Sequence, residues 1–458
     1  MNPKNHQASR PNIILINCDD LGFGDLGCYG SGVNSTPCLD RMAGEGLRLT
    51  HFSMAASVCS PSRGAMLTGC YPPRIGFGSF DDRPVLFPGQ PVGLSPDETS
   101  IATLLKRAGY ATSLVGKWHC GDQPEFLPTR HGFDHYYGLP YSNDMGRQAG
   151  REVDFPPLPL LRDEEVIEAQ PDQASLIERY TEEAVRFIRA ERDGPFFLYL
   201  AHMQVHLPLF APERFMKQSR NGRYGAAVEC VDWSTEVLLW ELERLGLTEN
   251  TLVIFTSDNG SNGRNGGSNG GLRGSKGSAW EGGFRVPCVM RWPGVIAPGE
   301  ECDAPVSAMD FLPTFASLAG VDWRCGRRID GCDAGGVLFE RTGTELERTE
   351  MFYYLGEELC AVRRGNWKYH VWNGNGPELF ELGTDPGESC NVLLDHPEVA
   401  RELEELLTAC RCDLGDSSMG MRGDGVRPIG RVNEAKPLTE FHPDCPYFEA
   451  EYDLSDAE

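Results

Sequence analysis

The chain has 458 residues with the apolar and charged content of a globular protein, so it can bury a large core and form two domains. Its net charge of −25 argues against nucleic acid or an anionic membrane as a partner, and no apolar run reaches membrane-spanning length. The first residues lack the apolar segment of a secretion signal, and the sixteen cysteines occur without C-x-x-C pairs, so we expect a cytoplasmic, bacterial protein with reduced thiols.

Strands and helices alternate through most of the chain. Continuous apolar runs predict buried strands at 12–17, 111–115, 195–200 and 251–256. Helical spacing of apolar residues predicts helices at 103–108, 175–191, 224–245 and 306–318. This alternation is typical of an α/β domain with a mostly parallel sheet flanked by helices.

The pattern changes near residue 345. Short segments there predict antiparallel strands at 351–354, 359–363, 367–372 and 378–382, followed by a helix at 397–409. We therefore predict a large first domain over residues 1–345, and a smaller C-terminal α+β domain with an acidic tail over residues 346–458.

Polar residues follow the carboxyl ends of the predicted strands, which is where open α/β sheets place their ligands. Asp19 and Asp20 follow the first strand, and Asp258 and Asn259 follow the last one. These three carboxylates and one amide form an all-oxygen set that suits Ca²⁺ or Mg²⁺, and adjacent carboxylates would repel each other without a cation. Each pair by itself fits a helix N-cap better than a metal site.

Residues 59–69 combine a thiol, a rigid proline and a guanidinium in one short segment, Cys-Ser-Pro-Ser-Arg-Gly-Ala-Met-Leu-Thr-Gly. Pro61 fixes the backbone beside Cys59. Arg63 lies one helical turn further on, so its planar fork can reach a tetrahedral oxyanion in the same pocket. In isolation, the motif equally fits a buried cysteine at a helix start with a surface arginine.

Further candidate residues lie at strand ends and in loops. They are Lys117 and His119 in Gly-Lys-Trp-His-Cys-Gly at 116–121, Ser142 in a turn, His206 before Leu-Pro, and Lys276 in the glycine-rich segment 262–283. Core histidines, a turn serine and a solvated loop lysine are the alternative interpretations. For His202 we expect a structural role. We expect the segment 262–283 to form a loop over the site.

Taken in chain order, these motifs resemble those of the type I (formylglycine-dependent) sulfatases, particularly arylsulfatase-A-like members of the alkaline-phosphatase-like superfamily. The resemblance extends from Asn12 to about Gly294 and continues more weakly beyond it. Cys120 departs from the family motif, because an apolar residue often occupies that place. The resemblance implies an alkaline-phosphatase-like sheet and an enzyme that hydrolyses a sulfate monoester of an aryl group or a carbohydrate.

The resemblance also implies a cofactor and a modification. Asp19, Asp20, Asp258 and Asn259 would hold Ca²⁺, although the residues themselves also allow Mg²⁺. Cys59 would be oxidised to formylglycine by a formylglycine-generating or maturase enzyme, which would be a transient partner. One hydroxyl of the hydrated aldehyde would attack sulfur, and the other would then lose a proton and expel sulfate.

The remaining roles follow from the same resemblance. Arg63 would hold the hydrate and the sulfate with the metal, and Lys117 and Lys276 would bind the other sulfate oxygens. Either Lys276 or His206 would protonate the leaving alcohol, and His119 would be the base. Ser142 would lie at the sulfate. We expect the crowding of positive charges to lower the pKa of the lysines.

Two alternative functions and the role of three tyrosines remain open at this point. A formylglycine-dependent phosphonate or phosphate ester hydrolase would share the same residues, and a non-catalytic homologue would keep them unmodified. The tyrosines at 136, 137 and 141 either stack on the substrate or pack in the core. Without a secretion signal, a small imported sulfated sugar is the expected substrate.

Overall fold

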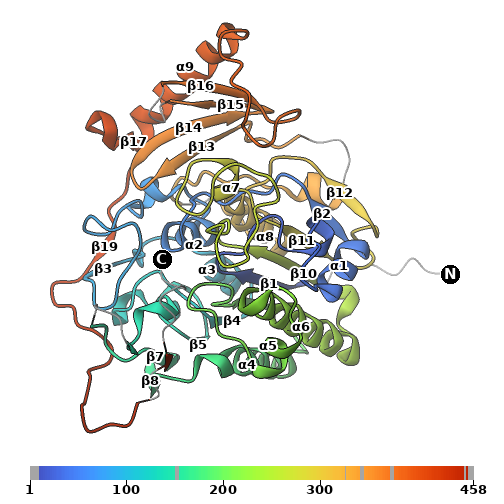
Figure 1. Cartoon of the computed structure of the whole chain (residues 1–458), viewed down its shortest axis with the longest axis vertical. Coiled ribbons are helices and arrows are strands. Elements are labelled where there is room, and N and C mark those ends of the chain that lie inside the picture. Colours follow the sequence, from blue (N-terminus) through green and yellow to red (C-terminus); the bar gives the residue numbers. More distant parts are fainter. Residues whose placement is uncertain are drawn as a thin grey trace.

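The computed structural model describes residues 10–149, 154–324, 326–340, 345–371, 376–447 and 450–451 (Figure 1). The first nine residues, position 372 at the end of a predicted strand, and the last residues of the acidic tail lie outside these ranges. No helix in the described ranges has both the length and the apolar composition needed to cross a membrane.

A large sheet of ten strands forms the centre of the first domain. In spatial order its strands are β12 (Glu300–Cys302), β2 (Leu47–Leu49), β11 (Cys288–Arg291), β10 (Thr251–Ser257), β1 (Asn12–Cys18), β9 (Phe196–Ala201), β4 (Ala111–Gly116), β5 (His135–Gly138), β7 (Pro159–Arg162) and β8 (Glu165–Ala169). The strands from β10 to β5 run parallel, whereas β11 and β7 flank them antiparallel. The prediction of a mostly parallel α/β sheet is confirmed.

Helices cover both faces of this sheet because its central strands are apolar on both sides. Ile13 and Leu15 of β1 point into one core, and Ile14 and Ile16 point into the other. The helices of the first core are α2 (Cys59–Thr68), α3 (Ile101–Arg107) and α8 (Phe311–Ala319). The helices of the second core are α1 (Pro37–Gly44), α4 (Leu176–Ala190), α5 (Glu213–Gln218) and α6 (Gly222–Leu245).

A second, antiparallel sheet lies at one end of the molecule, at the top of Figure 1. Its strands are β13 (Glu350–Leu355), β14 (Glu358–Arg364), β15 (Trp367–His370) and β16 (Glu378–Glu381). Helix α9 (Pro397–Leu414) packs on this sheet through Leu403 and Leu407. The predicted antiparallel strands and the helix after them are confirmed.

The chain beyond α9 returns to the first domain. Three short strand pairs form there: β17 (Gly415–Asp416) with β18 (Met421–Arg422), β19 (Gly430–Arg431) with β3 (Val92–Gly93), and β20 (Ala450–Glu451) with β6 (Gln148–Ala149). The last two pairs bind the C-terminal segment to the first domain. The domain boundary at residues 345 and 346 stays a prediction.

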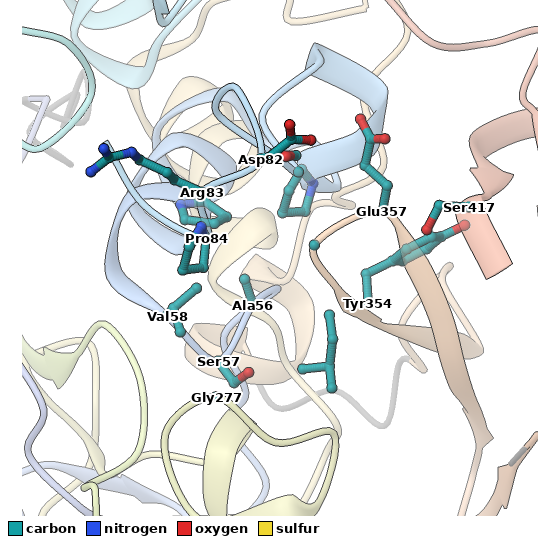
Figure 2. A pocket seen from close by; sticks show the side chains of 16 residues that line it. Ala56, Ser57, Val58, Asp82, Arg83, Pro84, Gly277, Tyr354, Glu357 and Ser417 are labelled. Atoms are coloured by element: carbon teal, nitrogen blue, oxygen red, sulfur yellow. The ribbon is translucent and has the colours of Figure 1, made fainter. Parts of the chain in front are cut away.

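A cavity of about 490 Å³ separates the two domains beside the start of α2 (Figure 2). Its walls include Ala56 and Val58 from the first domain, Tyr354 from β13, and Glu357 from the turn between β13 and β14. The two domains therefore enclose a space that neither of them forms alone.

Buried ion pairs also connect the C-terminal sheet to the first domain. Lys368 of β15 lies 3.0 Å from Glu281, which begins α7 (Glu281–Phe284), and 3.0 Å from Glu388. All three side chains are fully buried. Glu388 also accepts a hydrogen bond from the backbone N–H of Glu281 and pairs with His370 at 2.9 Å. Because α7 begins within the last residues of the glycine-rich segment 262–283, the C-terminal sheet fixes one end of that loop.

Replacing the shared cation should destabilise the fold. Lys368→Met removes the cation that two buried carboxylates share, so we expect a loss of about 3–5 kcal/mol in the free energy of unfolding, measured by urea denaturation. Lys217→Met is the matched control, because Lys217 pairs with Glu213 at the exposed surface and should change stability little. Equal midpoints for the two variants would contradict the assigned role of Lys368.

Candidate active site at the carboxyl edge of the sheet

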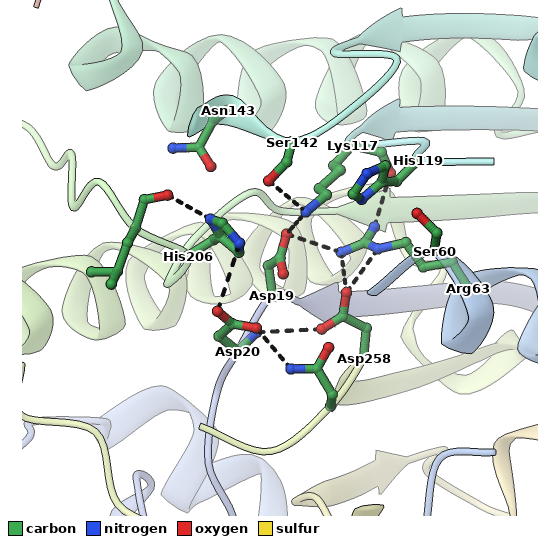
Figure 3. A network of polar contacts seen from close by, with 12 residues as sticks. Asp19, Asp20, Ser60, Arg63, Lys117, His119, Ser142, Asn143, His206 and Asp258 are labelled. Carbon is green, nitrogen blue, oxygen red and sulfur yellow. Dashed lines mark hydrogen bonds and ion pairs between the residues drawn. The ribbon is translucent and has the colours of Figure 1, made fainter. Parts of the chain in front are cut away.

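Four neighbouring parallel strands end at one edge of the large sheet, and each delivers polar side chains there (Figure 3). These side chains are Asp19 and Asp20 after β1, Lys117 and His119 after β4, His206 after β9, and Asp258 and Asn259 after β10. Arg63 reaches the same place from α2, and Lys276 from the glycine-rich segment. The structure thus brings these residues together, as the sequence predicts.

The acidic residues form a buried, all-oxygen cluster. Asn259 donates from its amide nitrogen to Asp20 at 2.7 Å, and the backbone N–H of Asp20 lies 3.3 Å from a carboxylate oxygen of Asp258. A ring nitrogen of His206 adjoins this oxygen set, since it and carboxylate oxygens of Asp19 and Asp20 all lie within 4.8 Å of one another. No helix begins directly after either acidic pair in the described chain, so the N-cap interpretation is wrong.

Two oxygens of this cluster lack a hydrogen-bond partner although they are buried. They are Oδ1 of Asp19 and Oδ1 of Asn259. Leaving such an oxygen unsatisfied in the interior costs about 1–3 kcal/mol or more, whereas a hard cation would coordinate it. The donor set therefore fits a divalent cation such as Ca²⁺ or Mg²⁺.

Two fully buried cations balance the carboxylates. Arg63 donates from Nε to Asp258 at 2.8 Å, and its Nη2 lies 3.5 Å from Asp19. Its Nη1 donates to the backbone carbonyl of Lys117 at 2.9 Å. The ammonium of Lys117 pairs with Asp19 and donates to Ser142 Oγ at 3.0 Å. Ser142 therefore joins the cluster, as the sequence predicts.

These pairings decide the direction of the pKa shifts. Burial raises the pKa of Asp19, but Lys117, His206 and Arg63 outweigh it and lower the pKa overall. Burial, together with the charge of Asp19, raises the pKa of Asp258. Burial lowers the pKa of Lys117, but its contact with Asp19 raises the pKa above its ordinary value. The prediction that crowding lowers the pKa of the lysines is wrong for Lys117, because a carboxylate is its nearest partner.

His119 is held as a neutral imidazole. Its Nε2 lies 2.9 Å from the carbonyl oxygen of Leu86 and, as a donor there, leaves Nδ1 as an acceptor with no partner. Burial and the charge of Lys117 hold its pKa well below the usual range. The backbone of His119 is left-handed, with φ of 58°, a strained conformation that often marks functional sites. The arrangement leaves a nitrogen that can accept a proton.

Lys276 and His206 meet at the outer side of the cluster. Lys276 Nζ lies 2.9 Å from Asp20 Oδ2 and 3.1 Å from His206 Nε2. Backbone bonds fix the loop here, since Lys276 N–H donates to Ser261 and Gly277 N–H donates to Ser57. The glycine-rich segment therefore does form a loop over the site.

Cys59 is the first residue of α2 and is almost fully buried. Burial raises the pKa of its thiol to about 12, even though the charges of Lys117 and Lys276 lower it. Asp19 and Asp258 also raise this pKa, so Cys59 lies within the electrostatic field of the cluster. The unmodified side chain is a protonated thiol at neutral pH and a poor nucleophile.

Other residues of the sequence prediction belong to the interior. His202 is fully buried, and burial lowers the pKa of its imidazole to about 3, in keeping with the structural role expected for it. Tyr136, Tyr137 and Tyr141 are buried in the two cores, so packing is the interpretation that the structure confirms.

Sequence reasoning missed two contributors to this site. Leu86 holds His119 through a backbone carbonyl, which no side-chain motif reveals. Asn143 lies beside Ser142 (Figure 3), and its Oδ1 is buried without a hydrogen-bond partner. The signal for Asn143 was its place in the polar run Ser-Asn-Asp at 142–144.

Comparison with known proteins supplies independent information. The family model described as Sulfatase matches residues 11–321, and the model described as N-sulphoglucosamine sulphohydrolase, C-terminal, matches residues 275–413. N-acetylgalactosamine-6-sulfatase of Rattus norvegicus is 40% identical over 85% of this chain and 77% of its own length. Steryl-sulfatase of Rattus norvegicus is 39% identical over 86% of this chain and 88% of its own length.

A solved structure agrees with these relatives. The crystal structure of Ps i-CgsB in complex with k-i-k-neocarrahexaose superimposes with a TM-score of 0.79 at 31% sequence identity. The match covers 88% of this chain and 92% of that chain.

The buried thiol at position 59 has a testable reactivity. In protein that carries unmodified cysteine there, iodoacetamide should alkylate the exposed Cys390, Cys412 and Cys445 well before Cys59. Because its pKa is raised to about 12, the thiolate fraction of Cys59, and with it the alkylation rate, should still be rising above pH 9. Peptide mass spectrometry over a pH series gives both rates. Alkylation of Cys59 as fast as Cys412 at pH 8 would contradict the described environment.

Proposed function

Because the chain belongs to the sulfatase family, we propose that it hydrolyses the sulfate ester of a sulfated carbohydrate, using formylglycine at position 59 and a bound divalent cation. That it is a sulfuric ester hydrolase follows from the family. The observation that carries the finer proposal is the buried cluster itself, in which the acidic set and the cations Arg63, Lys117 and Lys276 meet beside the start of α2.

The cation is proposed on the chemistry of its donors. Asp19, Asp20, Asp258 and Asn259 would hold it, and Ca²⁺ suits this all-oxygen set, with Mg²⁺ as the alternative. When bound, it would offset negative charge on the sulfate oxygens.

The modification is proposed on the chemistry of Cys59. A thiol whose pKa is raised to about 12 supplies little nucleophile at neutral pH, whereas a hydrated aldehyde offers one hydroxyl for attack and a second for release of sulfate. A formylglycine-generating or maturase enzyme is therefore proposed as a transient partner. Because the Cys59 side chain is almost fully buried, that enzyme must act before the fold closes.

The protein's own side chains divide the remaining tasks. Lys117 and Ser142 lie side by side and would bind sulfate oxygens, while Arg63 is fixed by Asp258 and adds a permanent positive charge. Lys276 would protonate the leaving alcohol, because it is the more exposed cation of the cluster and donates toward His206.

His119 would accept the proton in the release step. Its imidazole is uncharged, and its Nδ1 has no other partner in the described structure. Proton removal by a positioned base of this kind typically contributes about 10²–10⁴-fold to a rate.

The substrate class rests on the relatives. N-acetylgalactosamine-6-sulfatase supports a sulfated amino sugar, and steryl-sulfatase at similar identity makes a steryl or aryl sulfate the second candidate. Both relatives are named as sulfatases, which favours a sulfate ester over a phosphonate ester as the substrate.

Activity of matched variants tests the proposed function. The wild-type protein should release sulfate from N-acetylgalactosamine 6-sulfate faster than from 4-nitrophenyl sulfate, with little turnover of a 4-nitrophenyl phosphonate. Cys59→Ala should abolish sulfate release and keep the near-ultraviolet circular dichroism of the fold, and Cys59→Ser should be inactive from an aerobic host. The exposed Cys412→Ala is the control and should retain full activity. Near-normal rates in Cys59→Ala would refute the assignment.

Cation binding has a readout that needs no substrate. Adding Ca²⁺ to chelator-treated protein should raise its Tm by several degrees, because the ion satisfies the unpartnered oxygens and relieves carboxylate repulsion. Asp258→Asn should lose most of this shift, whereas Asp193→Asn, an exposed carboxylate, should keep it. A full Ca²⁺ shift in Asp258→Asn would place the ion elsewhere.

A further inference from the structure

The segment 21–25, directly after the proposed cation ligands, packs against the glycine-rich loop. The N–H of Gly24 donates to the carbonyl of Ser268 at 2.9 Å. A Cβ atom on Gly22 would lie 2.2 Å from that same carbonyl oxygen, and one on Gly24 would lie 2.5 Å from the backbone nitrogen of Gly270. Both positions therefore require glycine, because the two backbones are in direct contact.

Asp25 joins these two segments through both of its carboxylate oxygens. Its side chain is fully buried. One oxygen accepts a hydrogen bond from the backbone N–H of Ser268 at 2.9 Å. The other accepts from the N–H of Gly22 at 2.8 Å and from the hydroxyl of Tyr224 in α6. Asp25 therefore holds the loop both to the segment after the cation ligands and to a helix of the second core.

Asn269 follows Ser268 directly and extends this attachment toward Lys276. Its side-chain oxygen accepts from the N–H of Ser261 at 2.9 Å, and its amide donates to the carbonyls of Ser261 at 3.0 Å and Gly274 at 3.2 Å. The N–H of Lys276 donates to the same carbonyl of Ser261 at 3.0 Å. Hydrogen bonds and one peptide link thus connect the anchored part of the loop to the backbone of Lys276.

A carboxylate is costly to bury in this position. Burial raises the pKa of Asp25 to about 7, although the hydrogen bonds that it accepts lower it. The three donors named above are neutral, so they compensate the cost of burial less than a cation would. An apolar side chain would avoid this cost, but it would leave the N–H of Ser268 without its acceptor. The attachment of the loop is therefore what this carboxylate contributes.

We propose that Asp25 is a positioning residue for the reaction: by fixing the glycine-rich loop to the segment after the cation ligands, it sets the place of Lys276. The inference rests on the proposed function, in which Lys276 protonates the leaving alcohol. Lys276 lies 2.9 Å from Asp20, so a shift of the loop by about 1 Å takes the ammonium out of hydrogen-bonding range. A misplaced proton donor slows the departure of a poor leaving group far more than that of a good one.

Hydrogen exchange of the full-length protein, followed by peptide mass spectrometry, tests the attachment without turnover. In Asp25→Asn, an NH₂ group replaces one oxygen and faces a donor on whichever side it lies, so part of the attachment is lost. We expect exchange in residues 262–276 to become about fivefold faster or more than in the wild type. Exchange in strand β10 should change little, because the attachment lies outside the sheet.

Asp232→Asn is the matched control. Asp232 is also a buried carboxylate, and burial likewise raises its pKa, to about 6. It accepts from the backbone N–H groups of Cys38 and Leu39 in α1 rather than from the loop. Its replacement should also destabilise the fold, yet it should leave exchange in residues 262–276 at the wild-type rate.

Activity supplies a readout that a general loss of stability does not move. In formylglycine-containing enzyme, Asp25→Asn should lower kcat/KM for N-acetylgalactosamine 6-sulfate about tenfold or more, and kcat/KM for 4-nitrophenyl sulfate less than about threefold, because nitrophenolate leaves without a proton. Asn269→Ala, which cuts the same connection without altering a buried carboxylate, should change the ratio of the two values in the same direction. Asp232→Asn should keep the wild-type ratio.

The proposal is overturned if exchange in residues 262–276 stays at the wild-type rate in Asp25→Asn, or if it accelerates equally in Asp232→Asn. It is also overturned if Asp25→Asn slows both substrates by the same factor, or if Asn269→Ala keeps the wild-type ratio. If exchange behaves as expected but the wild-type enzyme releases sulfate from neither substrate, the proposed function fails and the attachment of the loop by Asp25 stands.

Discussion

The pairing of buried carboxylates with buried cations at one edge of the large sheet is the constraint on which the site depends. Asp19, Asp20 and Asp258 face Arg63, Lys117 and Lys276, so three negative charges meet three positive charges. Burying any of these alone would cost several kcal/mol, roughly the whole margin of stability of a domain. Each charge is tolerated because its partner is fixed by a different strand, helix or loop.

This balance also explains how a chain with a net charge of −25 can attract an anion. The side chains of the cluster sum to neutral, so the proposed divalent cation would make the pocket positive by about two charges. The positive region is confined to the sheet edge. A local field of this kind would attract the sulfate group of a substrate although the chain as a whole is acidic.

The C-terminal sheet contributes to the site from two sides. Lys368 holds Glu281 and Glu388, and thereby the end of the loop that carries Lys276. The turn between β13 and β14 places Tyr354 and Glu357 on the cavity wall. The smaller domain therefore positions a proposed proton donor and forms part of the cavity wall. Removing one of its buried charges should for this reason also disturb the loop of the first domain that carries Lys276.

The sequence by itself determined the alternation of strands and helices and the convergence of Asp19, Lys117, His206 and Asp258. Apolar runs mark buried parallel strands, and parallel strands end at a common edge, so residues that follow each run must meet. Tertiary structure alone decided the contact of Leu86 with His119, the raised pKa of Lys117 and the unpartnered hydroxyl of Ser57. Those features depend on which distant atoms approach a group and how far water is excluded from it, and no local pattern in the chain encodes either quantity.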